Sequence, residues 1–130
     1  MKFAPKNPPR RFPVGNAAKF DMKDCGTLSL EPDEQVTFTT EGGAEYDVAR
    51  KDWGFYATPS LNGRLEQFGL RGVLIKNRGT GRYFVLLVEK GREAAFDAYC
   101  IQENLMVVTW LDSTVTLDAV AQRLAGSKGR

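Results

Sequence analysis

The chain has 130 residues, 42% of them hydrophobic and 26% charged, a composition typical of a single globular domain. It contains no histidine, which excludes Ser-His-Asp and Cys-His catalytic groups and histidine-ligated metal sites. Its two cysteines, Cys25 and Cys100, are too few for a structural zinc site, and in a reducing compartment such a pair is typical of free thiols. We therefore expect no metal and no cofactor.

Apolar residues do not form a run long enough to cross a membrane. The longest stretch, Tyr83–Val88, has six residues, far fewer than the roughly 20 that a spanning helix needs. The N-terminus carries prolines and arginines where a signal peptide would have an apolar segment. We expect a cytoplasmic protein without a membrane partner.

The net charge of +2 is unevenly distributed along the chain. Residues 1–23 hold four of the six prolines, and six Lys or Arg side chains against one aspartate. Because the Pro8-Pro9 pair fixes the backbone and lacks N–H donors, this proline-rich basic arm is predicted to be extended, neither helix nor central strand. Either it wraps over the domain, which Phe12 and Phe20 favour, or it is loose.

Residues 24–126 are predicted to form one β-rich globular domain, which begins with a hairpin over residues 26–50. Val36 and Phe38 alternate with threonines, the period-two pattern of a strand. The 41–43 segment, Glu-Gly-Gly, supplies the turn because glycine tolerates a positive φ angle.

A short strand is expected at 54–57, followed by a loop over 58–69. A second hairpin is predicted over 70–89, with the glycine-containing segment 77–81 as its turn. The run Tyr83–Val88 shows no polar alternation, so we expect a central strand that is buried on both faces.

Helical periodicity begins near residue 92. Phe96 and Cys100 are four residues apart and share one face of a helix over 92–103, which Asn104 is expected to end. Leu105–Leu111 is a second apolar run that predicts a buried strand. A strand, a helix and a strand within about 30 residues favour a parallel crossover.

The last element predicted is a helix over 116–126. Thr116 is its expected N-cap, and Val115 is expected to pack on Val120 as a hydrophobic staple. Residues 127–130 are predicted to be a frayed tail. The apolar stripe of this helix comprises Leu117, Val120, Ala121 and Leu124.

These elements predict an α+β fold, mainly antiparallel β-sheet with two C-terminal helices. A small cupin-like β-barrel with appended helices is the alternative, because short strands around proline-containing turns resemble that class. The missing histidine metal motif and the two terminal helices argue against it.

The segment 50–64 concentrates aromatic and polar side chains in a loop. Flat aromatic faces beside amide and charged groups suit a sugar ring or a nucleobase, which stacks while the polar groups fix its orientation. The candidate ligand-binding residues are Trp53, Tyr56, Asn62, Arg64, Arg50 and Asp52. The alternative interpretation is that Trp53 and Tyr56 are core aromatics and that Asn62 belongs to a simple turn.

Three functions are compatible with this sequence. The leading one is a non-catalytic binding or accessory module that holds a small polar ligand of sugar or nucleotide type, or a protein partner, around the 50–64 loop. The second is binding of nucleic acid or another anionic partner through the basic arm, although the pI of 8.6 is below the value of about 9 expected of a dedicated nucleic-acid binder. The third is a histidine-free isomerase or lyase that uses Asp47 or Asp52 with Tyr56 and Arg64. Strand edges and the arm also favour a homodimer.

Overall fold

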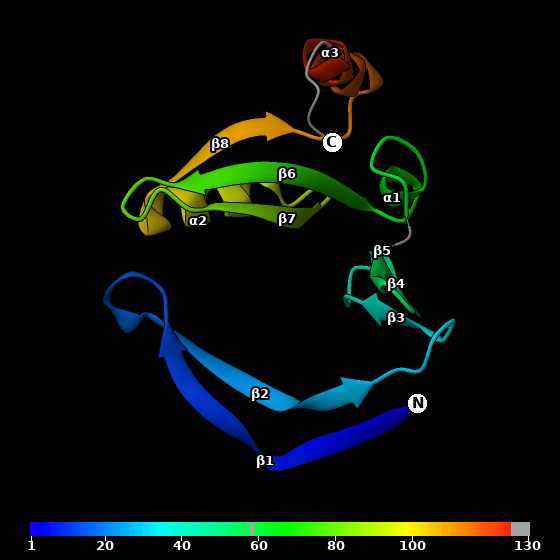
Figure 1. Ribbon diagram of the computed structural model, residues 1–130. Coiled ribbons are helices and arrows are strands. Elements are labelled where there is room, and N and C mark those ends of the chain that lie inside the picture. The colour runs from blue at the N-terminus through cyan, green and yellow to red at the C-terminus, as the bar shows by residue number, and fades with distance from the viewer. Residues whose placement is uncertain (58, 126–130) are drawn as a thin grey trace. The chain divides into compact units, whose positions relative to one another are not determined.

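The computed structural model describes residues 1–57 and 59–125 (Figure 1). The chain divides into two compact units. The first comprises Met1–Thr37 and Asp47–Thr58, and the second comprises Phe38–Tyr46 and Pro59–Arg130. Within the described ranges the elements are mainly antiparallel strands with three α-helices, which confirms the α+β fold. These strands form open sheets of two and three strands and no closed barrel.

The N-terminal residues form a two-stranded antiparallel ribbon. Strand β1 (Lys2–Val14) pairs with β2 (Phe20–Ser29), and a short 3-10 turn (Asn16–Ala18) joins them. The pairing is irregular between Pro5 and Arg10, the interval that holds Pro8 and Pro9, because proline has no N–H to donate to the ladder. The extended conformation expected of the arm is confirmed, but the arm folds back on itself as a hairpin, and its expected limit at residue 23 falls inside β2.

The second sheet has the order β3-β4-β5. It comprises β3 (Gln35–Thr39), β4 (Glu45–Lys51) and β5 (Gly54–Ala57), with β4 and β5 antiparallel. In the turn between β3 and β4, Thr40 N donates to Ala44 O over 3.1 Å, and Gly43 has a φ of 92°, which favours glycine. This confirms the first predicted turn.

The third sheet has the order β7-β6-β8. Both β7 (Tyr83–Glu89) and β8 (Leu105–Trp110) run antiparallel to the central β6 (Leu70–Asn77), so they are parallel to each other. Helix α2 (Glu93–Glu103) connects them as the expected crossover and ends at Asn104, which has a φ of 56° and a ψ of 47°. The second predicted hairpin, the helix and its end are confirmed.

The main hydrophobic core lies between α2 and one face of this sheet (Figure 1). Phe96 and Cys100 of α2 are buried against the sheet, and the Phe96 ring meets the edge of Trp110 with centroids 5.8 Å apart. Burial, and the nearby Asp97 carboxylate, raise the pKa of the Cys100 thiol. The buried members of this core are Val73, Ile75, Val88, Phe96 and Cys100.

The expectation that Tyr83–Val88 is a central strand is wrong. β7 lies at the edge of the sheet, and the β6 strand, which carries Arg71 and Lys76, takes the centre. An uninterrupted apolar run suggests burial on both faces, but it carries no information on strand order, and at an edge such a run remains exposed. The β8 run is likewise an edge strand, with Val108 43% exposed.

Arg71 joins the end of the third sheet to the segment that follows it. Its guanidinium donates to both carboxylate oxygens of Asp112, over 2.6 and 3.4 Å, and to Glu93 over 3.3 Å. It also lies 4.0 Å from the centre of the Trp110 ring. The Arg71 guanidinium holds the pKa of the Asp112 carboxyl below its ordinary value.

The remaining helices are α1 (Arg64–Gln67) and α3 (Thr114–Ala125). Ser113 caps α3, since its Oγ accepts a hydrogen bond from Thr116 N over 3.3 Å, so the predicted cap at Thr116 is wrong. Val115 therefore lies inside the helix and is 80% exposed, without the predicted staple. Gly126 and the predicted tail lie outside the described residues. No helix within the described ranges has both the length and the apolar character needed to cross a membrane.

Candidate functional site

The β4–β5 hairpin carries four of the six candidate residues, all in the first unit. Ala49 pairs with Tyr56, and Arg50 pairs with Phe55, so that Asp52 and Trp53 form a two-residue turn. Gly54 follows with a φ of 145°, a conformation that favours glycine. The local sequence therefore fixes a tight hairpin with an aromatic residue at its tip.

Aromatic rings on this hairpin are exposed. Trp53 is 68% exposed, Phe55 65% and Tyr56 52%, which excludes the interpretation of Trp53 and Tyr56 as core aromatics. Successive residues of a strand point to opposite faces, so Phe55 and Tyr56 lie on the two sides of the hairpin and Trp53 at its end. Phe55 is not among the six predicted candidate residues. It pairs with Arg50 across the hairpin, and the alternation of side chains along the strand indicates its place on the face opposite that of Tyr56.

Arg50 positions the hairpin. Its guanidinium donates to the carbonyl of Lys51 over 2.8 Å and to that of Leu30 over 3.1 Å. The Arg50 carbonyl accepts a hydrogen bond from Asp33 N over 2.6 Å, and Arg50 N donates to the carbonyl of Glu34 over 2.9 Å. Because two of its donors are directed at main-chain carbonyls, Arg50 is better suited to hold the hairpin in place than to bind an anion.

An ion pair adds to this attachment. Lys51 Nζ donates to an Asp33 carboxylate oxygen, and this hydrogen bond raises the pKa of the Lys51 ammonium. Asp52 lies exposed in the turn beside it. The base of the hairpin is thus fixed by polar contacts, whereas its tip and both aromatic faces are open.

Asn62 and Arg64 belong to the second unit. Asn62 lies in the turn before α1, and its side-chain amide donates to Thr114 Oγ1 at the start of α3 over 3.1 Å. The exposed Arg64 guanidinium lies 5.1 Å from the centre of the Phe68 ring. Each of these polar groups therefore has a local contact within its own unit.

The two candidate carboxylates for acid–base chemistry lie apart on β4 and its turn. Asp47 is only 9% exposed and accepts a hydrogen bond from Thr37 Oγ1 over 2.5 Å, whereas Asp52 is exposed. Asp52 comes five residues after Asp47, which in extended chain is a separation of roughly 16 Å. The pair does not share one site, and within the described ranges no cluster of three Cys, Asp or Glu side chains could hold a metal.

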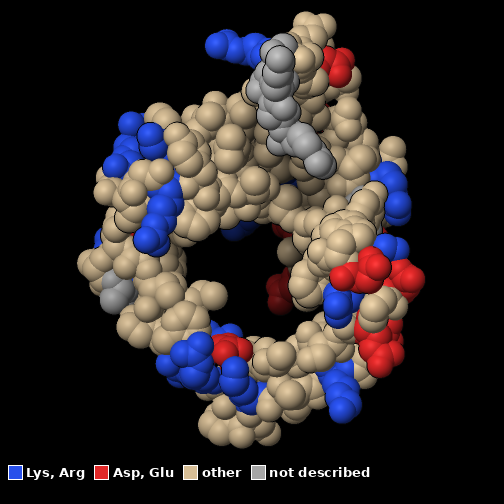
Figure 2. All heavy atoms as spheres, viewed as in Figure 1, with Lys and Arg blue, Asp and Glu red and all other residues tan. Residues whose placement is uncertain are grey.

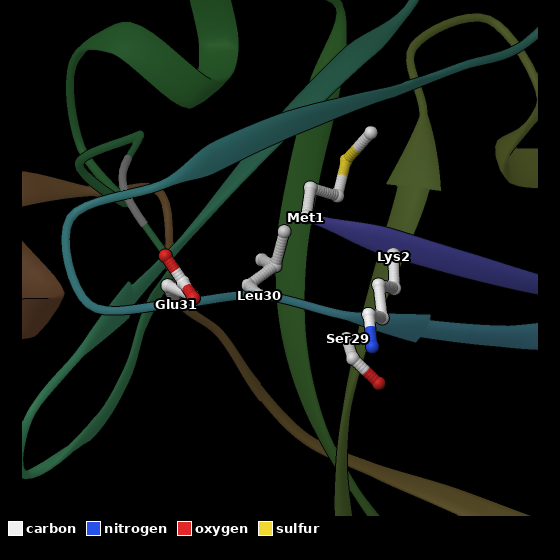
Figure 3. A pocket seen from close by; sticks show the side chains of 5 residues that line it. All are labelled: Met1, Lys2, Ser29, Leu30 and Glu31. Atoms are coloured by element: carbon white, nitrogen blue, oxygen red, sulfur yellow. The ribbon is translucent and has the colours of Figure 1, made fainter.

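A pocket of about 360 Å³ lies in the first unit at the open end of the β1–β2 ribbon (Figure 3). Lys2 and Ser29 are paired across the ribbon, and their side chains point to the same side, while Leu30 points toward Met1. None of the six candidate residues lines it, but Arg50 holds its wall through the Leu30 carbonyl. The lining residues are Met1, Lys2, Ser29, Leu30 and Glu31.

Comparisons of this chain with protein-family models, with curated proteins and with solved structures found no match.

Proposed function

We propose that this protein is a non-catalytic binding module whose β4–β5 hairpin docks on a protein partner. The observation that carries the proposal is the exposure of three neighbouring rings, Trp53, Phe55 and Tyr56, each more than half open to solvent. Trp and Tyr are the residues that most often dominate the energetics of protein interfaces. An exposed apolar group of this size on a fixed hairpin is typical of an interaction site.

The geometry favours a protein partner over a small ligand. The rings lie on both faces and at the tip of the hairpin, so a partner that takes the hairpin into a groove would cover all three. A single sugar or base can stack on only one of them. Because Arg50 and Lys51 hold the hairpin in place, docking orders few additional side chains, which lowers its entropic cost.

Photo-crosslinking tests the proposal. Trp53 is replaced by benzoylphenylalanine in the full chain, with the same replacement at Ile101, which is 84% exposed on α2, as the matched control. We expect a discrete crosslinked protein from position 53 that is absent from position 101. With that partner purified, Trp53→Ala should weaken binding at least tenfold. The same set of crosslinks from both positions would overturn the proposal.

Tryptophan fluorescence tests the small-ligand version. The chain has two tryptophans, so a response to sugars or nucleotides that disappears in Trp53→Phe would come from the hairpin. A response that survives this substitution would come from Trp110. We expect no saturable response from either class of compound, and one that Trp53→Phe abolishes would favour the small-ligand version instead.

The β1–β2 ribbon supports a second candidate, binding of an anionic partner. Figure 2 shows Lys and Arg side chains gathered over the ribbon with acidic groups between them. Lys6 and Arg10 lie 2.6 and 3.4 Å from Asp24, and Arg11 lies 2.7 Å from Asp21, so these three charges are partly neutralised. Within the described residues no ion pair involves the three other basic side chains of the ribbon, Lys2, Lys19 and Lys23.

Salt dependence measures this candidate. On single-stranded DNA, three available charges give a slope of about −2 in the logarithm of affinity against the logarithm of salt concentration. Replacing Lys2, Lys19 and Lys23 by Gln, which leaves the hairpin pairing intact, should remove that dependence for single-stranded DNA. Binding to DNA that the triple variant retains would exclude the ribbon.

A further inference from the structure

The strand β7 exposes side chains on both of its faces. Tyr83 is 57% exposed, Phe84 48% and Val85 58%. Along a strand, Phe84 points to the face opposite that of Tyr83 and Val85. Within the described residues no second strand pairs with β7 on the side away from β6, since the strand order is β7-β6-β8.

The described edges of β8, β1 and β2 carry features that oppose pairing with another chain. β8 has an irregular register opposite Leu74 and Ile75, and such bulges twist an edge away. β1 contains four prolines, and β2 places charged side chains at residues 21, 23 and 24. Tyr83–Val88 has no proline and no charge, and its pairing with β6 is regular. Among the edges of β1, β2, β7 and β8, that of β7 is therefore best suited to accept another strand, and its seven residues exceed the five of β3 and the four of β5.

We propose that the β7 edge binds the β7 edge of a second copy of this chain in antiparallel orientation. An antiparallel edge is complementary to itself, since a twofold rotation brings each row of free N–H and C=O groups opposite its equivalent. The two three-stranded sheets then form one six-stranded sheet. The two copies contribute the same residues to the interface.

The exposed side chains select the register. With the twofold axis at Phe84, the two Phe84 rings lie opposite each other, and Tyr83 lies opposite Val85 of the second copy, so exposed residues cover exposed residues. An axis at Leu86 would place Arg82 opposite Lys90, a pair of like charges. The Glu89 end is also occupied within its own chain, because Thr40 donates to its carboxylate.

The area sets the strength of this dimer. Three half-exposed side chains offer on the order of 300 Å² per copy, against about 800 Å² in a standard interface. The dimer is therefore reversible and dissociates on dilution.

Disulfide trapping tests the register in a Cys25→Ser background, which leaves only the buried Cys100. Opposite residues of antiparallel strands have Cα atoms about 4.5 to 5.5 Å apart, within disulfide range, and diagonal ones about 7 to 8 Å apart, beyond it. Phe84→Cys should form a covalent dimer on oxidation. Tyr83→Cys and Val85→Cys should each stay monomeric alone but crosslink when mixed. Val108→Cys, on the other edge, is the matched control and should stay monomeric.

Mass measurement by light scattering tests the surface without a crosslink. The mass of the wild-type chain should rise toward that of two chains with concentration, and Val85→Lys should abolish the rise while Val108→Lys leaves it unchanged. Both valines are exposed, so a melting curve should show both variants folded. A wild-type chain that keeps the mass of one copy at the highest concentration, or a dimer that Val85→Lys leaves intact, would overturn the proposal.

Discussion

Removal of the Arg71 side chain should destabilise the third sheet measurably. The guanidinium makes one short and two longer hydrogen bonds to carboxylates and lies over the Trp110 ring, while the side chain is 27% exposed. Hydrogen bonds to charged groups contribute about 1.5 to 3 kcal/mol and a cation–π contact about 0.5 to 2 kcal/mol. For a partly exposed group we take the lower part of each range, about 2 kcal/mol for the hydrogen bonds together and about 1 kcal/mol for the ring contact. We therefore expect Arg71→Ala to lower the free energy of unfolding by about 3 kcal/mol. Arg71→Lys, which keeps the charge but not the planar fork, should cost about half as much.

The assay is urea unfolding in a Trp53→Phe background, where Trp110 is the remaining tryptophan and reports on this sheet. Since Arg71 lowers the pKa of Asp112, the ion pair contributes fully above the unfolded pKa near 4, and its contribution is lost as the pH falls through the lower folded value. Stability should thus fall more steeply below about pH 4 in the wild type than in Arg71→Ala. Asp112→Asn is the control and should remove the same pH-dependent part. A loss below 0.5 kcal/mol, or unchanged acid dependence, would refute the reasoning.

Three further changes test the core, the helix end and the thiols. Ile75→Ala, at a side chain 1% exposed, should cost about 3 kcal/mol in urea unfolding, because it leaves a cavity. Asn104→Ala should cost about 1 kcal/mol and Asn104→Gly much less, because alanine is strained in the left-handed conformation that α2 ends on; equal losses would contradict this. Iodoacetamide followed by mass spectrometry should modify the exposed Cys25 well before Cys100, whose raised pKa reduces its thiolate, and urea should remove the difference.

The sequence predicts local structure here better than it predicts which strands pair with each other. The turn at 41–43, the 70–89 hairpin and the helix ending at Asn104 are confirmed, because glycine, alternation and helical spacing act within a few residues. The prolines of residues 1–23 predict an extended arm, but they do not indicate that β1 pairs with β2. The central position of Tyr83–Val88 was wrong because an apolar run does not reveal which strand lies between two others.

The candidate site divides in the same way. The short strand predicted at 54–57 is confirmed, but its pairing of Phe55 with Arg50 is not predicted, because the glycines and Pro59 of 50–64 indicate a loop. The role of Arg50 depends on carbonyls that the 30–34 turn brings to it, and no short-range pattern reveals such a contact. Asn62 and Arg64 are close to Trp53 in sequence, yet they belong to the second unit.

Acrylamide quenching of tryptophan emission is the most direct test of the exposed hairpin on which the proposed function depends. The difference between the wild type and Trp53→Phe isolates the emission of Trp53. We predict a long-wavelength emission that acrylamide quenches almost as well as that of free tryptophan. A blue-shifted emission that is protected from the quencher would contradict the exposure of this ring and, with it, the binding role proposed for the hairpin.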